Sequence, residues 1–389
     1  MYPNLYYAFK DLFGLELAPL RFINSFGFFV AISFFLAAAT LAAELKRKGK
    51  AGLLQPVEET IKVGEPASAL SLLLNFLFGF VVGYKIIALF FAPPSVAADP
   101  QAYLFSGAGS LPLGLLTGAL FASWTWWEKS KQKLEKPESR IVRLWPHDRV
   151  GEITVLALVF GILGAKLFDI FENWGDFLKR PSTYLLSPAG LTFYGGLICA
   201  AIAIILFARK NKIPVLHLAD SVAPGLMLAY AVGRLGCQVS GDGDWGIVNT
   251  APKPVSWMPD WFWAYNYPHN VNEVGVPIPG CADRYCMVLG EPVFPTPLYE
   301  TVTCLILFGV LWALRKRLRP YGAIFCLYLI LNGLERFFIE KIRVNNKISF
   351  LGMQVTQAEI ISVCLVLAGL GLWLYLVARS NKAVVYNKS

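Results

Sequence analysis

The chain has 389 residues, of which 56% are hydrophobic and 16% are charged, and its mean hydropathy is +0.52. Soluble domains contain roughly 45–50% apolar and 25% charged residues, so this composition excludes a soluble enzyme of two ordinary domains and a disordered chain. The net charge of +9 is typical either of nucleic-acid binding or of cytoplasmic loops in a membrane protein, and the distribution of Lys and Arg decides between them.

Nine apolar runs are long enough to cross a bilayer core of about 30 Å as helices. The runs 111–127 and 219–237 are the weakest, because they are shorter or richer in small and polar residues. Together the runs predict an all-α fold, a polytopic transmembrane helix bundle that forms one integral membrane domain over residues 1–389. In chain order they lie near residues 20–43, 68–92, 111–127, 151–171, 190–208, 219–237, 297–314, 322–341 and 357–378.

Lys and Arg are divided unevenly between the segments that connect these runs. The connecting segments that would face one side of the membrane hold 22 of them, and those that would face the other side hold 7. Because positive residues are enriched in cytoplasmic loops, this asymmetry predicts an outside N-terminus and a cytoplasmic C-terminus. The net charge is therefore a topology signal, and we expect no nucleic-acid partner.

Two connecting segments differ from the others in composition. Residues 128–150 are rich in charge and are predicted to form a cytoplasmic linker. Residues 238–296 carry Trp and Tyr among Pro and Gly, which predicts a large outward-facing loop region on the headgroup layer. Cys281 and Cys286 lie close together in that region, and the sequence leaves open whether they are bridged. With three His and no metal-ligand spacing, we expect no metal site and no cofactor.

Charged residues inside apolar runs are expensive in hydrocarbon and usually functional. Arg234 lies near the outer end of the sixth run, beside a glycine-rich turn, and Arg336 and Glu340 lie four residues apart on one face of the eighth. Two guanidinium groups near the outer leaflet suit a phosphate, so the residues alone indicate a site for an anionic lipid or a phosphate. The alternative is a structural Arg336–Glu340 pair that neutralises itself.

Four segments follow one another in an order and spacing that resemble the bacterial prolipoprotein diacylglyceryl transferases. They are LTFYGGLICAAIAIILFARKNKIPVLHLADSVAPGLMLAYAVGRLGC followed by DWG, then PTPLYE, then GLERFFIEKIR. The resemblance covers residues 15–45 and 150–380. Residues 46–145, which contain two of the predicted spans, are interpreted as an insertion relative to that family.

The resemblance implies a multi-pass enzyme of the bacterial inner membrane with its active site toward the outer leaflet. Such an enzyme transfers the diacylglyceryl group of phosphatidylglycerol to the lipobox cysteine thiol of prolipoproteins, which forms a thioether and releases glycerol phosphate. Arginines at the phosphate would stabilise its departing charge. The alternative is a non-catalytic lipid-binding or lipid-moving membrane paralogue. A solute transporter is disfavoured, because the sequence has no internal repeat.

The resemblance also assigns roles by position. Catalytic positions fall on Arg234, Arg336, Glu340 and Tyr194. Substrate-binding positions fall on Arg234, Gly233, Gly236, Gly246, Asp220, Tyr299, Glu300 and Arg343.

This sequence departs from the family pattern at several motif positions. Tyr194 replaces a His, and a phenol, with an ordinary pKa near 10, is a poor base at neutral pH. Tyr194 would then donate a hydrogen bond. The thiol would lose its proton under the positive field of the arginines, to an acidic residue, or to His269 as the base. The other departures are Cys237 for an Asn, Phe26 for a Tyr, and one extra residue before Trp-Gly, so that either Asp242 or Asp244 stands for the family's acidic residue.

Overall fold

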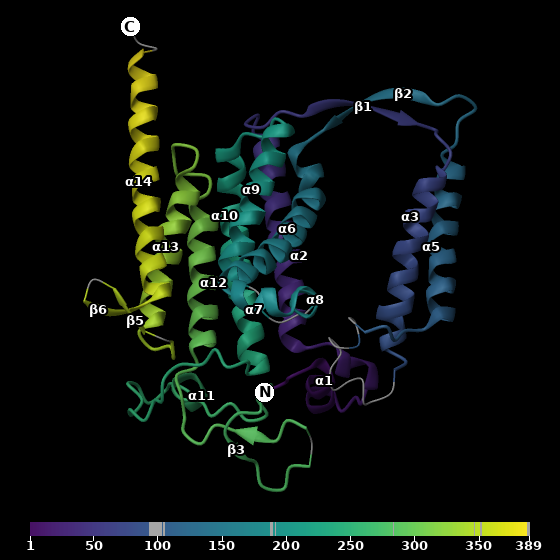
Figure 1. Ribbon diagram of the computed structural model, residues 1–389. Helices are drawn as coiled ribbons and strands as arrows, with labels where there is room; N and C mark the ends of the chain where they lie inside the picture. The colour runs from purple at the N-terminus through teal and green to yellow at the C-terminus, as the bar shows by residue number, and fades with distance from the viewer. Residues whose placement is uncertain are drawn as a thin grey trace. The chain divides into compact units, whose positions relative to one another are not determined.

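The computed structural model describes residues 1–92, 103, 106–186, 190, 192–282, 284–345, 347–350 and 352–386. Helices dominate these residues (Figure 1). The chain divides into two units by its internal contacts. The first unit comprises Met1–Glu16, Ile23–Leu54 and Ala208–Ser389, and the second comprises Leu17–Phe22 and Gln55–Phe207.

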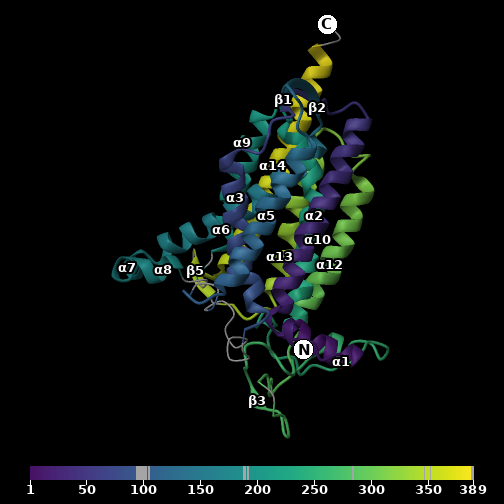
Figure 2. The ribbon, with the colours of Figure 1, turned by 90° about the vertical axis from the view of Figure 1, so that its right-hand side faces the viewer.

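Helix α10 (Val215–Ser240) lies at the centre of the first unit. It packs against α2 (Ser25–Lys50), α12 (Thr296–Leu314) and α13 (Ala323–Glu340), and α13 packs in turn against α14 (Gln357–Tyr386). Figures 1 and 2 show these helices running side by side. The first unit is therefore a helix bundle in which α10 contacts three neighbours.

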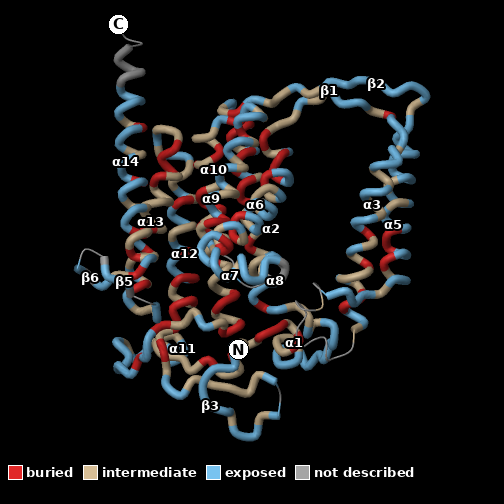
Figure 3. Tube along the Cα trace, viewed as in Figure 1, coloured by how far each residue is buried: buried red, intermediate tan, exposed pale blue. Residues whose placement is uncertain are grey.

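Small residues let these helices approach closely, as is common in membrane bundles. A Cβ atom at Gly225 of α10 would lie 3.1 Å from the carbonyl oxygen of Ala37 in α2, and one at Gly333 of α13 would lie 2.7 Å from that of Ser362 in α14. Figure 3 shows the buried positions concentrated along the inner helices of this unit. One buried apolar cluster joins α10, α12 and α13 through Ala223, Met227, Ala231, Cys304, Leu311 and Ile324.

The ends of α10 and α12 follow from local sequence. Helix α10 ends where Gly241 adopts φ 65°, a left-handed conformation that glycine tolerates without strain. Helix α12 begins at Thr296 with Pro297 in its first turn, where the missing N–H of proline has no helical partner to lose. The glycine-rich turn after α10 and the Pro-Thr-Pro segment before α12 thus bring both helix ends to one side of the first unit.

Seven described helices are long and apolar enough to cross a membrane, and they coincide with seven of the nine predicted runs. The other two runs also form helices, α5 (Leu111–Lys131) and α13, but these are not among the seven. Helix α5 carries three Trp residues, and α13 carries three charged residues near its end. The nine spans and the sidedness of the termini stay predictions. The seven helices span Ser25–Lys50, Ala69–Ile87, Pro146–Glu172, Phe193–Lys210, Val215–Ser240, Thr296–Leu314 and Gln357–Asn381.

From Gln55 onward, the segment interpreted as an insertion folds as a strand pair and a helix pair within the second unit. Strand β1 (Val57–Val63) pairs in antiparallel register with β2 (Glu138–Leu144), and Val57 is opposite Leu144. Between the strands, α3 (Ala69–Val81) continues into a π-helical turn, η2 (Val82–Ile87), and packs against α5. The Thr117 hydroxyl of α5 donates a 2.7 Å hydrogen bond to the carbonyl of Gly79 in α3. The limits of the insertion stay a prediction.

The rest of the second unit consists mainly of α6 (Val150–Glu172) and α9 (Phe193–Lys210), of which α9 belongs to this unit as far as Phe207. They approach through glycine, because a Cβ at Gly164 would lie 2.6 Å from the carbonyl oxygen of Gly195. Shorter elements are η1 (Ala18–Phe22), η4 (Pro146–Arg149), α7 (Trp174–Lys179) and α8 (Pro181–Leu186).

The region 238–296 of the first unit is mostly irregular, as its Pro and Gly content predicts. Cys281 and Cys286 form a disulfide, which answers the question that the sequence left open. Trp257 and Trp261 are exposed. Short elements of the first unit include α1 (Leu5–Phe13), α11 (Asp260–Trp263), the pair β3 (Val276–Pro277) and β4 (Met287–Val288), and the pair β5 (Lys347–Phe350) and β6 (Met353–Thr356).

Candidate active site

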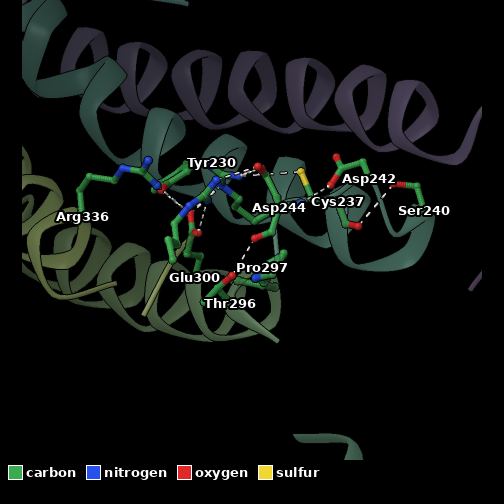
Figure 4. Close-up of polar contacts among 12 residues, drawn as sticks. Tyr230, Cys237, Ser240, Asp242, Asp244, Thr296, Pro297, Glu300 and Arg336 are labelled. Carbon is green, nitrogen blue, oxygen red and sulfur yellow. Dashed lines mark hydrogen bonds and ion pairs between the residues drawn. The ribbon is translucent and has the colours of Figure 1, made fainter. Parts of the chain in front are cut away.

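Three arginines of the first unit gather around one buried carboxylate (Figure 4). Arg234 comes from the last two turns of α10, Arg336 from α13, and Arg343 from the segment just after α13. The carboxylate is that of Glu300 in the first turns of α12, and its side chain is 0% exposed. The structure therefore brings together four of the predicted site residues from three helices and the segment that follows α13.

Glu300 is the common partner of the arginines. Its Oε2 lies 2.6 Å from Nε of Arg234 and 3.8 Å from Nη1 of Arg336, and its Oε1 accepts a 2.9 Å hydrogen bond from Nη1 of Arg343. The Tyr230 hydroxyl also donates to Oε2, at 2.6 Å. A buried carboxylate is tolerated when charged donors surround it, and such charge-assisted hydrogen bonds are about twice as strong as neutral ones. Glu300 therefore fixes the positions of the guanidinium groups.

Asp244 forms the second bridge between arginines. Its Oδ1 accepts a 2.6 Å hydrogen bond from Nη2 of Arg343, and its Oδ2 pairs with Nη1 of Arg234. Its backbone carbonyl accepts a 2.7 Å hydrogen bond from the Thr296 hydroxyl. Burial alone raises the pKa of Asp244, but Arg234 and Arg343 outweigh that effect and hold this pKa below its ordinary value. Asp244 is therefore ionised while it bridges the two arginines.

Asp242 differs from Asp244 although the two lie in the same turn. Its Oδ1 accepts a 3.4 Å hydrogen bond from the backbone N–H of Asp244, and no ion pair joins it to a described arginine. Burial raises the pKa of Asp242 above its ordinary value. Of the two acidic residues that the sequence left open, Asp244 is the one in contact with the arginines.

Glu340 pairs with Arg336 as their four-residue spacing predicts. Nη2 of Arg336 lies 3.2 Å from Oε2 of Glu340, and Asn345 donates a 2.5 Å hydrogen bond to Oε1. Within the described residues, Nη1 of Arg336 makes no hydrogen bond. Arg336 is therefore held on one side by Glu340, and on the other side its Nη1 forms the 3.8 Å ion pair with Glu300 without a hydrogen bond.

Glu335 was not predicted as a site residue. It lies on α13 beside Arg336 and is 7% exposed, and neither of its carboxyl oxygens has a hydrogen-bond partner among the described residues. It interacts electrostatically with Glu300, Arg336 and Arg234. An acidic residue next to Arg336 in an apolar run was a signal that pointed to it, because buried carboxyl groups are rare there.

The glycines of the motifs have different surroundings. The backbone N–H of Gly246 donates a 2.8 Å hydrogen bond to the carbonyl of Phe294, and a Cβ at Gly246 would collide with the carbonyl of Ile342, next to Arg343. A Cβ at Gly236 would lie 2.9 Å from Cβ of Phe29 in α2. Gly233, in contrast, has no described heavy atom within 4 Å of such a Cβ. Two of the three glycines thus permit close packing around the cluster.

Three predicted residues have other surroundings within their own units. Tyr194 is in the first turn of α9, in the second unit. Asp220 lies fourteen residues before Arg234 on α10, about 21 Å away at 1.5 Å per residue. Its carboxylate accepts hydrogen bonds from the backbone N–H groups of Gly322, at 2.7 Å, and Phe325, at 3.0 Å, so it caps the start of α13. The Tyr299 hydroxyl donates a 3.3 Å hydrogen bond to the carbonyl of Trp263.

One group of side chains has the donor types of a metal site. Ligand atoms of Cys237, Asp242 and Asp244 lie within 4.8 Å of one another. Both carboxyl oxygens of Asp244 are already engaged by guanidinium groups, and Sγ of Cys237 lies 3.9 Å from Nη1 of Arg234. The positive charge of the guanidinium groups at this distance opposes the binding of a cation by these three side chains.

Comparison with known proteins connects this arrangement to one family. The family model of the prolipoprotein diacylglyceryl transferases matches residues 108–375. A phosphatidylglycerol–prolipoprotein diacylglyceryl transferase of Clostridium novyi (strain NT) is 31% identical over 243 residues, which are 62% of this chain and 82% of the relative. Proteins with the same name from Shouchella clausii (strain KSM-K16) and Leptospira interrogans (strain Fiocruz L1-130) are 28% and 26% identical, covering 59% and 63% of this chain and 76% and 74% of the relatives.

These relatives are named as transferases, so the comparison does not favour the non-catalytic alternative. The family model covers more than half of the residues and includes every residue of the arginine cluster and the carboxylates that pair with it. The chain therefore belongs to the prolipoprotein diacylglyceryl transferase family.

Proposed function

We propose that this protein transfers the diacylglyceryl group of phosphatidylglycerol to the lipobox cysteine thiol of prolipoproteins. The cysteine sulfur forms a bond to the glyceryl carbon, the bond between that carbon and the phosphate oxygen breaks, and glycerol phosphate leaves with the electron pair. The family match and the name of the relatives support both substrates. The nucleophile belongs to the prolipoprotein, so no cysteine of this chain is needed for catalysis.

The observation that carries the proposal is the set of three largely buried arginines around Glu300. Negative charge grows on the phosphate as the carbon–oxygen bond breaks. Guanidinium groups that are already fixed in a site with little water stabilise such charge more strongly than mobile groups in water. We assign Arg234 and Arg336 to this catalytic role, and Glu340 holds Arg336 in place through the 3.2 Å ion pair.

The other motif residues receive supporting roles in this proposal. Arg343 contributes a third guanidinium, and Gly233 offers an open surface on α10 for the approach of substrate. Tyr194 donates a hydrogen bond instead of acting as the base, because its phenol has too high an ordinary pKa for proton removal at neutral pH. The thiol proton passes to an acidic residue or to solvent under the field of the arginines.

The proposed location is the bacterial inner membrane, with the reaction at the outer leaflet. The support is the excess of Lys and Arg in one set of connecting segments and the position of Arg234, six residues before α10 ends in the region 238–296. In this topology nine spans cross the membrane, the N-terminus is outside and the C-terminus is cytoplasmic. Prolipoproteins would meet the site after export.

The test uses purified full-length protein, phosphatidylglycerol and a lipobox peptide. Mass spectrometry should detect a diacylglyceryl adduct on the peptide cysteine. Arg336→Ala should abolish the adduct, and a thermal unfolding transition should show that the variant is still folded. A peptide with Ser in place of the lipobox Cys is the matched substrate control. An absent adduct from wild-type protein that is folded and binds the lipid would refute the transferase.

A further inference from the structure

The positive charge of the arginine cluster is already matched by carboxylates. Arg234, Arg336 and Arg343 contribute three charges, and the carboxylates that form ion pairs with them are those of Asp244, Glu300 and Glu340. A phosphodiester brings another negative charge into this largely buried site. Because an excess buried charge is costly, the lipid can bind only if one carboxylate moves away from the arginines.

The three carboxylates differ in how easily their side chains can move away from the arginines. The side chains of Glu300 and Glu340 are both 0% exposed, and Glu300 is also held by Tyr230. The side chain of Asp244 is 35% exposed. It belongs to a turn flanked by Gly243, which has φ 96°. Asp244 is therefore the carboxylate that can move with the least change in packing.

The backbone of Asp244 is fixed while its side chain can rotate. The carbonyl of Asp244 accepts the 2.7 Å hydrogen bond from Thr296, which is fully buried. Rotation about the Cα–Cβ bond would carry the carboxylate away from both guanidinium groups without moving this anchor. The two oxygens of Asp244 each face a different arginine, as two non-bridging oxygens of a phosphodiester would.

We propose that Asp244 is a resting-state counterion that occupies the phosphodiester position, and that phosphatidylglycerol binds by displacing it from Arg234 and Arg343. The identity of this lipid rests on the proposed function. Glu300 stays in place and continues to position the arginines after the exchange. Asp244 thereby sets the affinity for the lipid by competing with its phosphate, and it keeps the cluster neutral when no lipid is bound.

The test measures equilibrium binding of a fluorescent short-chain phosphatidylglycerol to full-length protein in detergent. Removing the competing charge with Asp244→Asn should tighten binding about tenfold. Asp244→Glu keeps the carboxylate and should stay within about twofold of wild type. The matched control is Asp242→Asn, the same substitution in the same turn at a carboxylate that forms no ion pair with a described arginine, and it should also stay within about twofold.

A second variant covers the case in which Asp244→Asn is too unstable to purify. Asp244→Ala leaves space for a small carboxylate, so acetate during purification replaces the missing counterion. Added acetate should then weaken lipid binding to Asp244→Ala and leave wild type unchanged. Equal or weaker lipid binding in Asp244→Asn, or no competition by acetate in Asp244→Ala, would overturn the proposal.

Two further arms separate the possible interpretations. Binding of glycerol phosphate is measured beside binding of the lipid. If Asp244→Asn binds only glycerol phosphate more tightly than wild type does, the proposal is overturned, because the position would then be a site for the free product. Transfer activity is measured in parallel. Active wild type with no tightening in Asp244→Asn refutes the counterion role and leaves the function standing. If Asp244→Asn binds the lipid more tightly but the wild type has no transfer activity, the proposed function is refuted and the displacement of Asp244 by a phosphodiester is supported.

Discussion

The hydroxyl of Tyr230 and the carboxylate of Glu300 form a 2.6 Å hydrogen bond between α10 and α12, on the same oxygen that Arg234 contacts. The bond links two helices at the level of the arginines. It also supplies a hydrogen-bond donor to a carboxylate whose side chain is 0% exposed.

Tyr230→Phe removes this donor and should lower the free energy of unfolding by about 1.5–3 kcal/mol, the range for a hydrogen bond to a charged group. Unfolding in mixed micelles of increasing denaturing detergent measures the change. Tyr299→Phe is the matched control, because its hydroxyl makes a 3.3 Å bond to a neutral carbonyl and its loss should cost less. Equal losses in both variants would contradict the role of the Tyr230 bond.

Glu300→Gln and Glu335→Gln make the same chemical change at two buried carboxyls with opposite surroundings. Glu300→Gln removes the buried one of the two carboxylates that Arg234 and Arg343 share and should destabilise by about 3–5 kcal/mol. Glu335→Gln breaks no hydrogen bond among the described residues and should change stability by less than about 1 kcal/mol. Thermal unfolding of the two purified variants compares them directly. A large loss in Glu335→Gln would show that this carboxyl has an essential partner.

Gly246→Ala and Gly233→Ala separate a packing glycine from an open one. The new Cβ at position 246 would collide with the carbonyl of Ile342 and shift Arg343, so we expect a loss of about 1–3 kcal/mol together with lower transfer activity. Gly233→Ala should keep or raise stability by up to about 1 kcal/mol, because alanine favours helix and space is available. Lower activity of a stable Gly233→Ala would support its proposed contact with substrate.

Asp220→Ala tests whether this residue serves the fold or the substrate. Losing the cap of α13 should cost about 1–2 kcal/mol, and Asp220→Asn, which keeps an acceptor oxygen, should cost less. The measured quantities are the midpoint of thermal unfolding and the KM for phosphatidylglycerol. Because Asp220 lies far along α10 from Arg234, the KM for phosphatidylglycerol should stay unchanged. A raised KM at unchanged stability would assign Asp220 to substrate binding.

The sequence predicted those parts of the site that lie on one helix. The four-residue spacing of Arg336 and Glu340 placed them on one face, and the structure pairs them. Apolar runs located the helices, and the motifs located the family, which the comparisons confirm. These features depend on local periodicity or on a short pattern, so they can be read without knowing the packing.

Contacts between distant segments could not be read in this way. Arg343 and Asp244 are 99 residues apart, and only the packing of the turn after α10 against the end of α13 brings them together. The choice between Asp242 and Asp244 depended on that contact. Tyr230 gave no signal, because a tyrosine in an apolar helix has the same pattern whether it faces lipid or a carboxylate. Asp220 carried a motif signal, and its contacts indicate a capping role.

The pairing of β1 with β2 has a consequence for how the length of this chain can vary. Val57 and Leu144 are register partners, so their Cα atoms lie about 4.5–5.5 Å apart, as opposed residues in antiparallel strands do. A two-residue turn spans such a distance. The chain therefore leaves and returns at neighbouring positions, so a short turn that replaced the strands and the helix pair between them would leave the ends of the flanking segments in place.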